Sequence, residues 1–141
     1  MAAAREHSAD VRWRDVDALD HVNHAVFLTY LEEGRDAFYT ELLGRDPSYV
    51  VVRLEIDLRT EVRYADRRVL VRIEAERLGT TSLTTRETIT TPSGELAAEA
   101  RVVTVRWDPL LRKPSPFTDA ERARLGEPAA GGPGAAGQTG P

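Results

Sequence analysis

The spacing of hydrophobic residues predicts one long helix near the start of the chain. Apolar residues recur at helical spacing between residues 24 and 43. This stripe is made of Leu28, Leu31, Phe38 and Leu42. The charged residues that fall largely on the opposite side are Glu32, Glu33, Arg35 and Asp36. Asn23 is a suitable N-cap, and Gly44 is a suitable C-terminal stop. We therefore expect an amphipathic helix over residues 24–43.

Beyond residue 49 the hydrophobic period falls to two, which is typical of strands with one buried face. Alternation and β-branched residues predict successive strands over residues 52–58, 69–78, 82–90 and 95–107. Before the helix, Val11 and Trp13 alternate with arginines and predict a short extended segment. Strands that follow one another through short turns favour an antiparallel sheet. The helix must then cover one face of that sheet, which makes the fold α+β.

The 141 residues suggest one domain. Residues 1–9 are expected to be a loose leader and residues 10–118 the folded domain. Residues 119–141 are expected to be a disordered tail, because their Gly, Pro and Ala side chains bury little surface. The N-terminus lacks the apolar segment of a signal peptide, and no apolar run is long enough to span a membrane, so we expect a cytoplasmic protein.

Composition narrows the range of functions. A net charge of -4 argues against nucleic-acid binding. The absence of cysteine excludes disulfides, thiolate metal sites and a cysteine nucleophile. The core of a chain this short is modest, so a second chain would usefully bury more surface.

The stretch RDVDALDHVNHAVF, residues 14–27, crowds three aspartates and two histidines in front of the helix. These residues are Asp15, Asp17, Asp20, His21 and His24. An EF-hand interpretation fails at three ligand or turn positions, and no βαβ pattern supports a nucleotide-sugar site. A transition-metal site and a solvated helix cap both remain open. In an extended segment Asp15 and Asp17 point to the same side, which suits one general base and one structural hydrogen-bond acceptor.

The region from residue 8 to residue 117 resembles the hotdog-fold acyl-CoA thioesterases, and more narrowly the 4-hydroxybenzoyl-CoA thioesterase group. The resemblance is carried by Asp-x-Asp at Asp15 and Asp17, His-Val-Asn at residues 21–23, Tyr-Leu-Glu at residues 30–32, and the segment RYAD at residues 63–66. It implies an antiparallel sheet wrapped around one long central helix. It also implies a homodimer or homotetramer with active sites between subunits. It implies no metal and no cofactor beyond the coenzyme A of the substrate.

The resemblance also implies which residues act. The catalytic acid of the family falls on Asp17, and His24 occupies a position where some relatives have histidine. The residues expected to contact substrate are Asn23, Ala25, Val26, Phe27, Tyr30, Arg63 and Tyr64. Further candidates for phosphate contacts are Arg59, Arg112 and Lys113, and the helix glutamates Glu32 and Glu33 are expected to serve catalysis or surface pairs. The family usually has glycine at the position of Asp20, which suggests a backbone with positive φ there.

Thioester hydrolysis fits these groups. Asp17 can act as a general base toward water, or attack the thioester directly to form a mixed anhydride. Unpaired backbone N–H groups of His24 and Ala25, at the helix N-terminus, can polarise the thioester carbonyl. The alternatives are a thioesterase acting on acyl-carrier protein, a hotdog dehydratase, and a non-catalytic acyl-CoA-binding or scaffolding protein.

Overall fold

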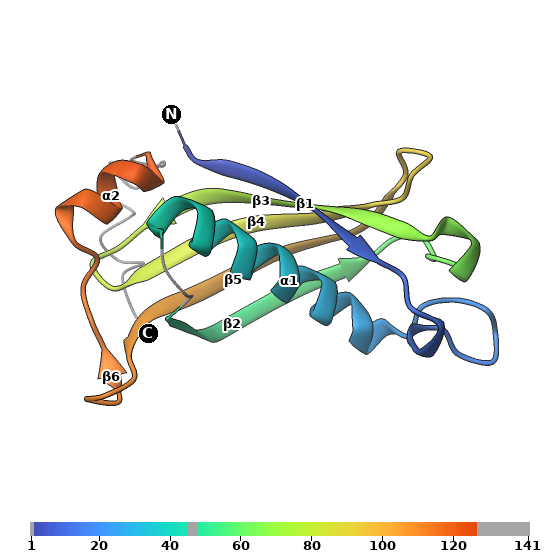
Figure 1. Cartoon of the computed structure of the whole chain (residues 1–141), viewed down its shortest axis with the longest axis horizontal. Helices are drawn as coiled ribbons and strands as arrows, with labels where there is room; N and C mark the ends of the chain where they lie inside the picture. The colour runs from blue at the N-terminus through green and yellow to red at the C-terminus, as the bar shows by residue number, and fades with distance from the viewer. Residues whose placement is uncertain (1, 45–47, 127–141) are drawn as a thin grey trace.

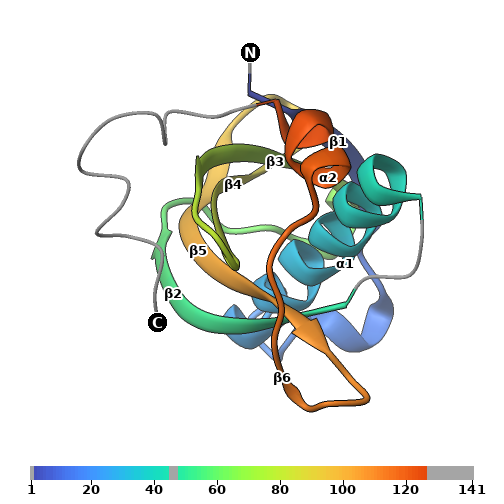
Figure 2. The ribbon, with the colours of Figure 1, turned by 90° about the vertical axis from the view of Figure 1, so that its left-hand side faces the viewer.

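The computed structural model describes residues 2–44 and 48–126. A long helix lies in the curl of an antiparallel sheet, with a short helix packed near its end (Figures 1 and 2). The elements are β1 (Ala4–Asp10), η1 (Trp13–Asp15), α1 (His24–Leu43), β2 (Tyr49–Leu58), η2 (Tyr64–Asp66), β3 (Arg68–Leu78), β4 (Ser82–Thr90), β5 (Leu96–Asp108), β6 (Lys113–Pro114) and α2 (Asp119–Leu125).

The strands run in the order β1-β3-β4-β5-β2, and each is antiparallel to its neighbour. β3, β4 and β5 follow each other through short turns, as expected. β2 precedes them in the chain but pairs with β5, so it forms one edge of the sheet while β1 forms the other. The expected fold, an antiparallel sheet wrapped around one long helix, is confirmed.

Helix α1 begins and ends where the sequence predicts. The Asn23 side chain accepts a hydrogen bond from the Ala25 amide, and Gly44 adopts the left-handed conformation with φ of 69°. Gly34 lets the helix approach β3 closely, because a Cβ there would lie 2.5 Å from Cγ1 of Val71. α1 is therefore held against β1 and β3 along its length.

The predicted polar face of α1 is wrong at Arg35. This residue is only 2% exposed, and its Nε donates to Oε2 of Glu87 on β4 at 3.1 Å. Thr85 Oγ1 donates to the same oxygen at 2.7 Å. Burial raises the pKa of the Glu87 carboxyl, while Arg35 and Thr85 oppose that shift by stabilising its charge. A strictly amphipathic interpretation misses such a pair because it assigns every charge to solvent.

Both ends of the domain are more ordered than expected. The prediction of a loose leader is wrong for residues 4–9, which belong to β1 and pair with β3. The extended segment is wrong at Trp13, which lies in the 3-10 turn η1. The tail is wrong for residues 119–125, which form α2 with a Thr118 capping box and a fully buried Leu125. Burial of Leu125 and the capping box stabilise α2 despite the polar composition of this segment. Residues 127–141 lie outside the described residues.

Strand β2 leaves an apolar surface open. Its outward-facing positions carry charges, while Leu54 and Ile56 are half-buried on the side toward the helix. Four further apolar side chains are exposed: Leu28 on α1 and Val51, Val52 and Leu58 on β2. The free edge of β2 and the exposed apolar side chains on this strand fit the expectation that a second chain would bury more of this domain.

Candidate active site

A short closed loop leads from η1 into α1. Val16 and Val22 form an isolated bridge, and the Asp17 amide donates to the His21 carbonyl at 3.0 Å. The Asp20 amide donates to the Asp17 carbonyl at 3.1 Å. Asp20 has a φ of 59°, so the prediction of a positive φ at this position is confirmed. Aspartate tolerates this conformation better than most residues do.

The same loop is tied to the segment that follows β2. The Val22 amide donates to the Val62 carbonyl at 2.7 Å. The Asp20 carboxylate accepts from Nη2 of Arg63 at 2.7 Å and from its Nε at 3.2 Å. This pair raises the pKa of the exposed Arg63 guanidinium. Arg63, expected to contact substrate, therefore holds the loop instead.

Asp15 is a structural acceptor, as one of the two motif aspartates was expected to be. It is only 6% exposed, and its Oδ2 accepts from the Tyr30 hydroxyl at 2.7 Å and from the Arg12 amide at 2.8 Å. Burial and the bond to Asp15 raise the pKa of Tyr30. Tyr30 is itself fully buried, which places this expected substrate contact in the core.

Asp17 faces an open hollow of about 280 Å³. We call this the Asp17 hollow; its lining residues are Asp17, His21, Val22, His24, Phe27, Leu58, Arg59, Thr60 and Glu61. Asp17 Oδ1 accepts from the Leu19 amide at 2.9 Å, and Oδ2 lies 3.6 Å from Nδ1 of His21. The side chain is one-third exposed (33%). It is thus oriented by the loop and still open to solvent.

The N-terminus of α1 opens on the same hollow through His24. The Ala25 amide was expected to be free, but it donates to Asn23 Oδ1 at 3.0 Å. The Val26 amide donates to the Asn23 carbonyl at 2.9 Å. Within the residues that the structure describes, the His24 amide has no hydrogen-bond acceptor. It is the backbone donor at this end of the helix that remains available to a ligand.

The remaining expected contacts are scattered. Phe27 is buried and supplies an apolar wall of the hollow. Asn23 serves as the helix cap, Val26 packs half-buried against the core, and Tyr64 lies edge-on to Trp13. Sequence reasoning missed Leu58, Thr60 and Glu61, which reach the hollow from the end of β2. The hydrogen bond from the Val22 amide to the Val62 carbonyl and the Asp20–Arg63 ion pair hold the end of β2 beside this loop. These contacts join residues far apart in the chain, so no local sequence pattern predicts them.

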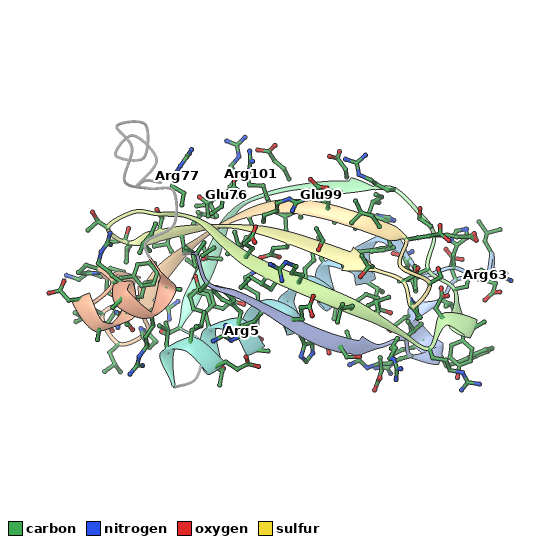
Figure 3. All side chains as sticks on the ribbon, turned by 90° about the horizontal axis from the view of Figure 1, so that it is seen from above. Arg5, Arg63, Glu76, Arg77, Glu99 and Arg101 are labelled. Atoms are coloured by element: carbon green, nitrogen blue, oxygen red, sulfur yellow. The ribbon has the colours of Figure 1, made fainter. Side chains whose placement is uncertain are left out.

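A second hollow, of about 270 Å³, lies on the outer face of the sheet. Charged side chains dominate its lining, and Arg86 and Glu99 pair across it at 3.4 Å. Figure 3 shows Glu76, Arg77, Glu99 and Arg101 projecting from this outer face, away from α1. The second hollow is lined by paired opposite charges and has little apolar surface. The Asp17 hollow is therefore the better candidate for chemistry on an acyl group.

Across residues 2–44 and 48–126, no three or more His, Asp or Glu side chains are grouped as metal ligands. None of the helices in those ranges combines the length and the apolar character needed to cross a membrane.

The curled antiparallel sheet around one central helix defines a hotdog fold. The sequence profile of the thioesterase-like superfamily matches residues 11–125, and the chain belongs to that superfamily. No match was found among curated proteins.

Solved structures agree with this assignment. A thioesterase from Thermus thermophilus, solved with coenzyme A and Zn, is 32% identical over 85% of this chain and 90% of its own, with a TM-score of 0.74. A candidate acyl-CoA thioesterase from Xanthomonas campestris is 30% identical over 74% of this chain and 93% of its own, with a TM-score of 0.65. A 1,4-dihydroxy-2-naphthoyl-CoA thioesterase from Synechocystis shares the fold at 18% identity, covering 87% of this chain and 96% of its own, with a TM-score of 0.73.

Proposed function

We propose that this protein hydrolyses acyl-CoA thioesters and that Asp17 carries the reaction. The observation behind this proposal is the position of Asp17, a partly exposed carboxylate that shares one hollow with His24, the first residue of α1, and with an apolar wall. Membership of the thioesterase-like superfamily supplies the reaction class. The relative from Thermus thermophilus solved with coenzyme A supports CoA as the thiol portion.

The groups of the hollow can carry out both halves of hydrolysis. In the general-base route, Asp17 takes a proton from water as the water oxygen attacks the thioester carbonyl. The developing oxyanion is stabilised by the His24 amide and the positive end of the α1 dipole. The C–S bond then breaks, the CoA thiolate leaves, and the proton held by Asp17 returns to it. His24 and His21 line the same hollow, and in this proposal they orient the water or the acyl oxygen.

The nucleophilic route uses the same atoms differently. A carboxylate oxygen of Asp17 attacks the carbonyl, the CoA thiolate leaves, and an Asp17–acyl anhydride remains. Water then hydrolyses the anhydride, and the acid is released with the carboxylate restored. The hydrogen bond from the Leu19 amide to Oδ1 leaves Oδ2 as the atom better placed to attack or to accept a proton.

We further propose that the site works in an oligomer. The hollow includes Leu58, which is 51% exposed at the open edge strand and continues the apolar surface of β2. A second copy covering that surface would close one side of the hollow and exclude water from the acyl group.

The test is thiol release from a panel of acyl-CoAs, measured with a free-thiol reagent on the wild type and on Asp17→Asn. We expect turnover of at least one acyl-CoA by the wild type and its loss in the variant. Asp119→Asn is a matched control, because Asp119 is exposed on α2 at the opposite end of the molecule (Figure 1). Binding of acyl-CoA without turnover would favour a non-catalytic protein. Turnover confined to acyl groups on acyl-carrier protein would show that the substrate is an acyl-carrier-protein thioester and not an acyl-CoA.

A single-turnover reaction in ¹⁸O-labelled water tests for the anhydride. Incorporation of label into the Asp17 carboxylate indicates the anhydride, because water attacking the Asp17 carboxyl carbon leaves its oxygen on the enzyme. Label found only in the released acid means that water attacked the acyl carbon, either of the thioester or of the anhydride, and chemical trapping of the acyl-enzyme then separates these two cases.

A further inference from the structure

An exposed pair of aromatic side chains lies beside the Asp17 hollow. Trp13 is 75% exposed and Tyr64 is 37% exposed. Their ring centroids are 5.3 Å apart, and the rings are nearly perpendicular at 87°. The two rings thus contact each other edge to face, and most of the indole surface is exposed to solvent. Tryptophan has a large apolar body and a polar N–H, a combination that is enriched where proteins bind partners.

The backbone places this pair next to the proposed catalytic loop. Trp13 belongs to η1 and Tyr64 to η2, and the Val11 amide donates to the Arg67 carbonyl at 2.8 Å between the two turns. Figure 1 shows both turns at the end of the molecule where α1 begins. Arg63, adjacent to Tyr64, holds Asp20 of the loop that carries Asp17. The aromatic pair therefore borders the mouth of the hollow rather than its interior.

Two of the arginines around the pair carry uncommitted charge. The guanidinium of Arg12 is engaged by Glu33, and that of Arg63 by Asp20. Arg14 and Arg67 are both exposed, and neither forms an ion pair with any residue that the structure describes. The carboxylate of Asp66, between Tyr64 and Arg67, instead accepts the Arg63 amide at 2.8 Å. An exposed indole therefore lies on the same two turns as two exposed arginines without an ion pair among the described residues, Arg14 in η1 and Arg67 at the end of η2.

Arg67 is held in an unusual conformation, with φ of 70° and ψ of -39°. This region costs a non-glycine residue free energy, and such strain persists where the surroundings enforce it. Here the Arg67 amide donates to the Tyr64 carbonyl at 3.1 Å while the Arg67 carbonyl accepts from Val11. The strained turn fixes Arg67 at the same spot as the aromatic pair.

We propose that Trp13, Tyr64, Arg14 and Arg67 form a nucleotide site that binds the phosphorylated adenosine end of coenzyme A. We call these four residues the aromatic patch. The adenine base would stack on the open indole face, and the guanidinium groups would pair with phosphate oxygens. This inference rests on the proposed function, because the acyl end of the same molecule would lie in the Asp17 hollow. The patch would then anchor the part of the substrate that does not react.

Intrinsic fluorescence tests binding without turnover. The chain has two tryptophans, so Trp107→Phe leaves Trp13 as the single reporter. We expect adenosine 3′,5′-bisphosphate and ADP to quench Trp13 emission saturably, and pantetheine, which has no nucleotide, to leave it unchanged. Absence of quenching by either nucleotide would overturn the proposal. So would Trp13 emission that changes with protein concentration alone, because a second copy would then cover the patch.

Truncated substrates test the role of the patch in turnover. Acyl-CoA and acyl-pantetheine share the thioester and differ only in the nucleotide. We expect Trp13→Ala to lower the ratio of their kcat/KM values by roughly 5- to 100-fold, mainly through KM for acyl-CoA, as loss of one stacked base implies. Arg67→Ala should lower the same ratio. Arg124→Ala is a matched control, since Arg124 is also an exposed arginine but lies on α2, at the opposite end of the molecule from the start of α1 (Figure 1).

The outcomes separate this inference from the proposed function. Equal loss with both substrates would show that Trp13 acts through the fold, and melting temperatures of the variants would confirm it. Nucleotide quenching without hydrolysis of any thioester would leave the nucleotide site standing and reject the enzyme. Thioester hydrolysis in which Trp13→Ala leaves the ratio of the two kcat/KM values unchanged would reject the nucleotide site and leave the proposed enzyme standing.

Discussion

Asp15 and Asp17 belong to one short motif and lie in opposite surroundings. Asp15 is buried and uses one oxygen to accept from Tyr30 and from the Arg12 amide. Asp17 lies in an open hollow, with one oxygen held by the Leu19 amide and the other facing His21. Two carboxylates of the same intrinsic acidity are thereby given different tasks. Satisfied hydrogen bonds make the first a structural anchor, and solvent access leaves the second able to react.

The comparison also shows how the two tasks depend on each other. The Asp15 carbonyl accepts from the Asn23 amide at 3.0 Å, so the residue that anchors the loop also positions the cap of α1. The proposed catalytic carboxylate, Asp17, and the helix N-terminus are thus both joined to their buried neighbour, Asp15. A rigid support for a reactive group is the usual way to keep it within productive geometry.

The largest effect is expected at Asp17. Asp17→Asn should lower kcat by about 10²- to 10⁴-fold, because the amide neither accepts a proton nor attacks a carbonyl. The free energy of unfolding should change by less than about 0.5 kcal/mol, as for a surface substitution. Steady-state kinetics and chemical denaturation on the same preparation measure both. A large loss of stability would mean that Asp17 is also an anchor, and the contrast with Asp15 would fail.

The converse is expected at Asp15. Asp15→Ala removes the acceptor of two buried donors and should lower the free energy of unfolding by about 3–5 kcal/mol. Denaturant titration measures this change, and Asp15→Asn is the milder control because it keeps an oxygen acceptor. An Asp15→Ala variant as stable as the wild type but inactive would place Asp15 in the chemistry and reverse the assignment.

Tyr30 reports on the same anchor through pH. Its raised pKa means that the folded state keeps the phenol proton after the unfolded chain loses it near pH 10. Stability therefore falls as pH rises above about 10, since ionisation favours the unfolded chain. Tyr30→Phe should cost about 1.5–3 kcal/mol at neutral pH and make that fall shallower. Melting temperatures measured from pH 7 to 11 test this prediction. An unchanged slope would show that the buried Tyr39 and the half-buried Tyr49, whose pKa values are also raised, dominate.

The smallest effect is expected at Asp20, the third aspartate of the stretch. Asp20→Gly removes an exposed ion pair with Arg63 but relieves a positive φ, so stability should change by less than about 1 kcal/mol. Activity should stay within a few-fold of the wild type. Asp20→Val is the sharper control, because a β-branched residue tolerates this backbone poorly. If Val and Gly behaved alike, the loop would not need its observed conformation.

Local chemistry made much of the fold predictable. Asn23 and Gly44 bound α1 because capping depends on neighbouring residues alone, and β4 matches its predicted range for the same reason. The resemblance that singled out Asp17 also marked Asp20 as a position for positive φ, and the structure confirms the conformation. Strand β3 buries Val69, Val71, Ile73 and Ala75, which the period of two assigns inward, whereas Leu54 and Ile56 on the apolar side of β2 are only half-buried.

By itself, then, the sequence determined the order of α1 and the four long strands that follow it, the bounds of α1 and the α+β class, because these follow from periodicity, capping and turn chemistry along the chain. Only the tertiary structure decided which side chains share a space. It buried Arg35 against Glu87, exposed Trp13 beside Tyr64, and brought Glu61 to the hollow of Asp17. These contacts join residues far apart in the chain, and their free energy depends on the whole packed sheet rather than on any local pattern.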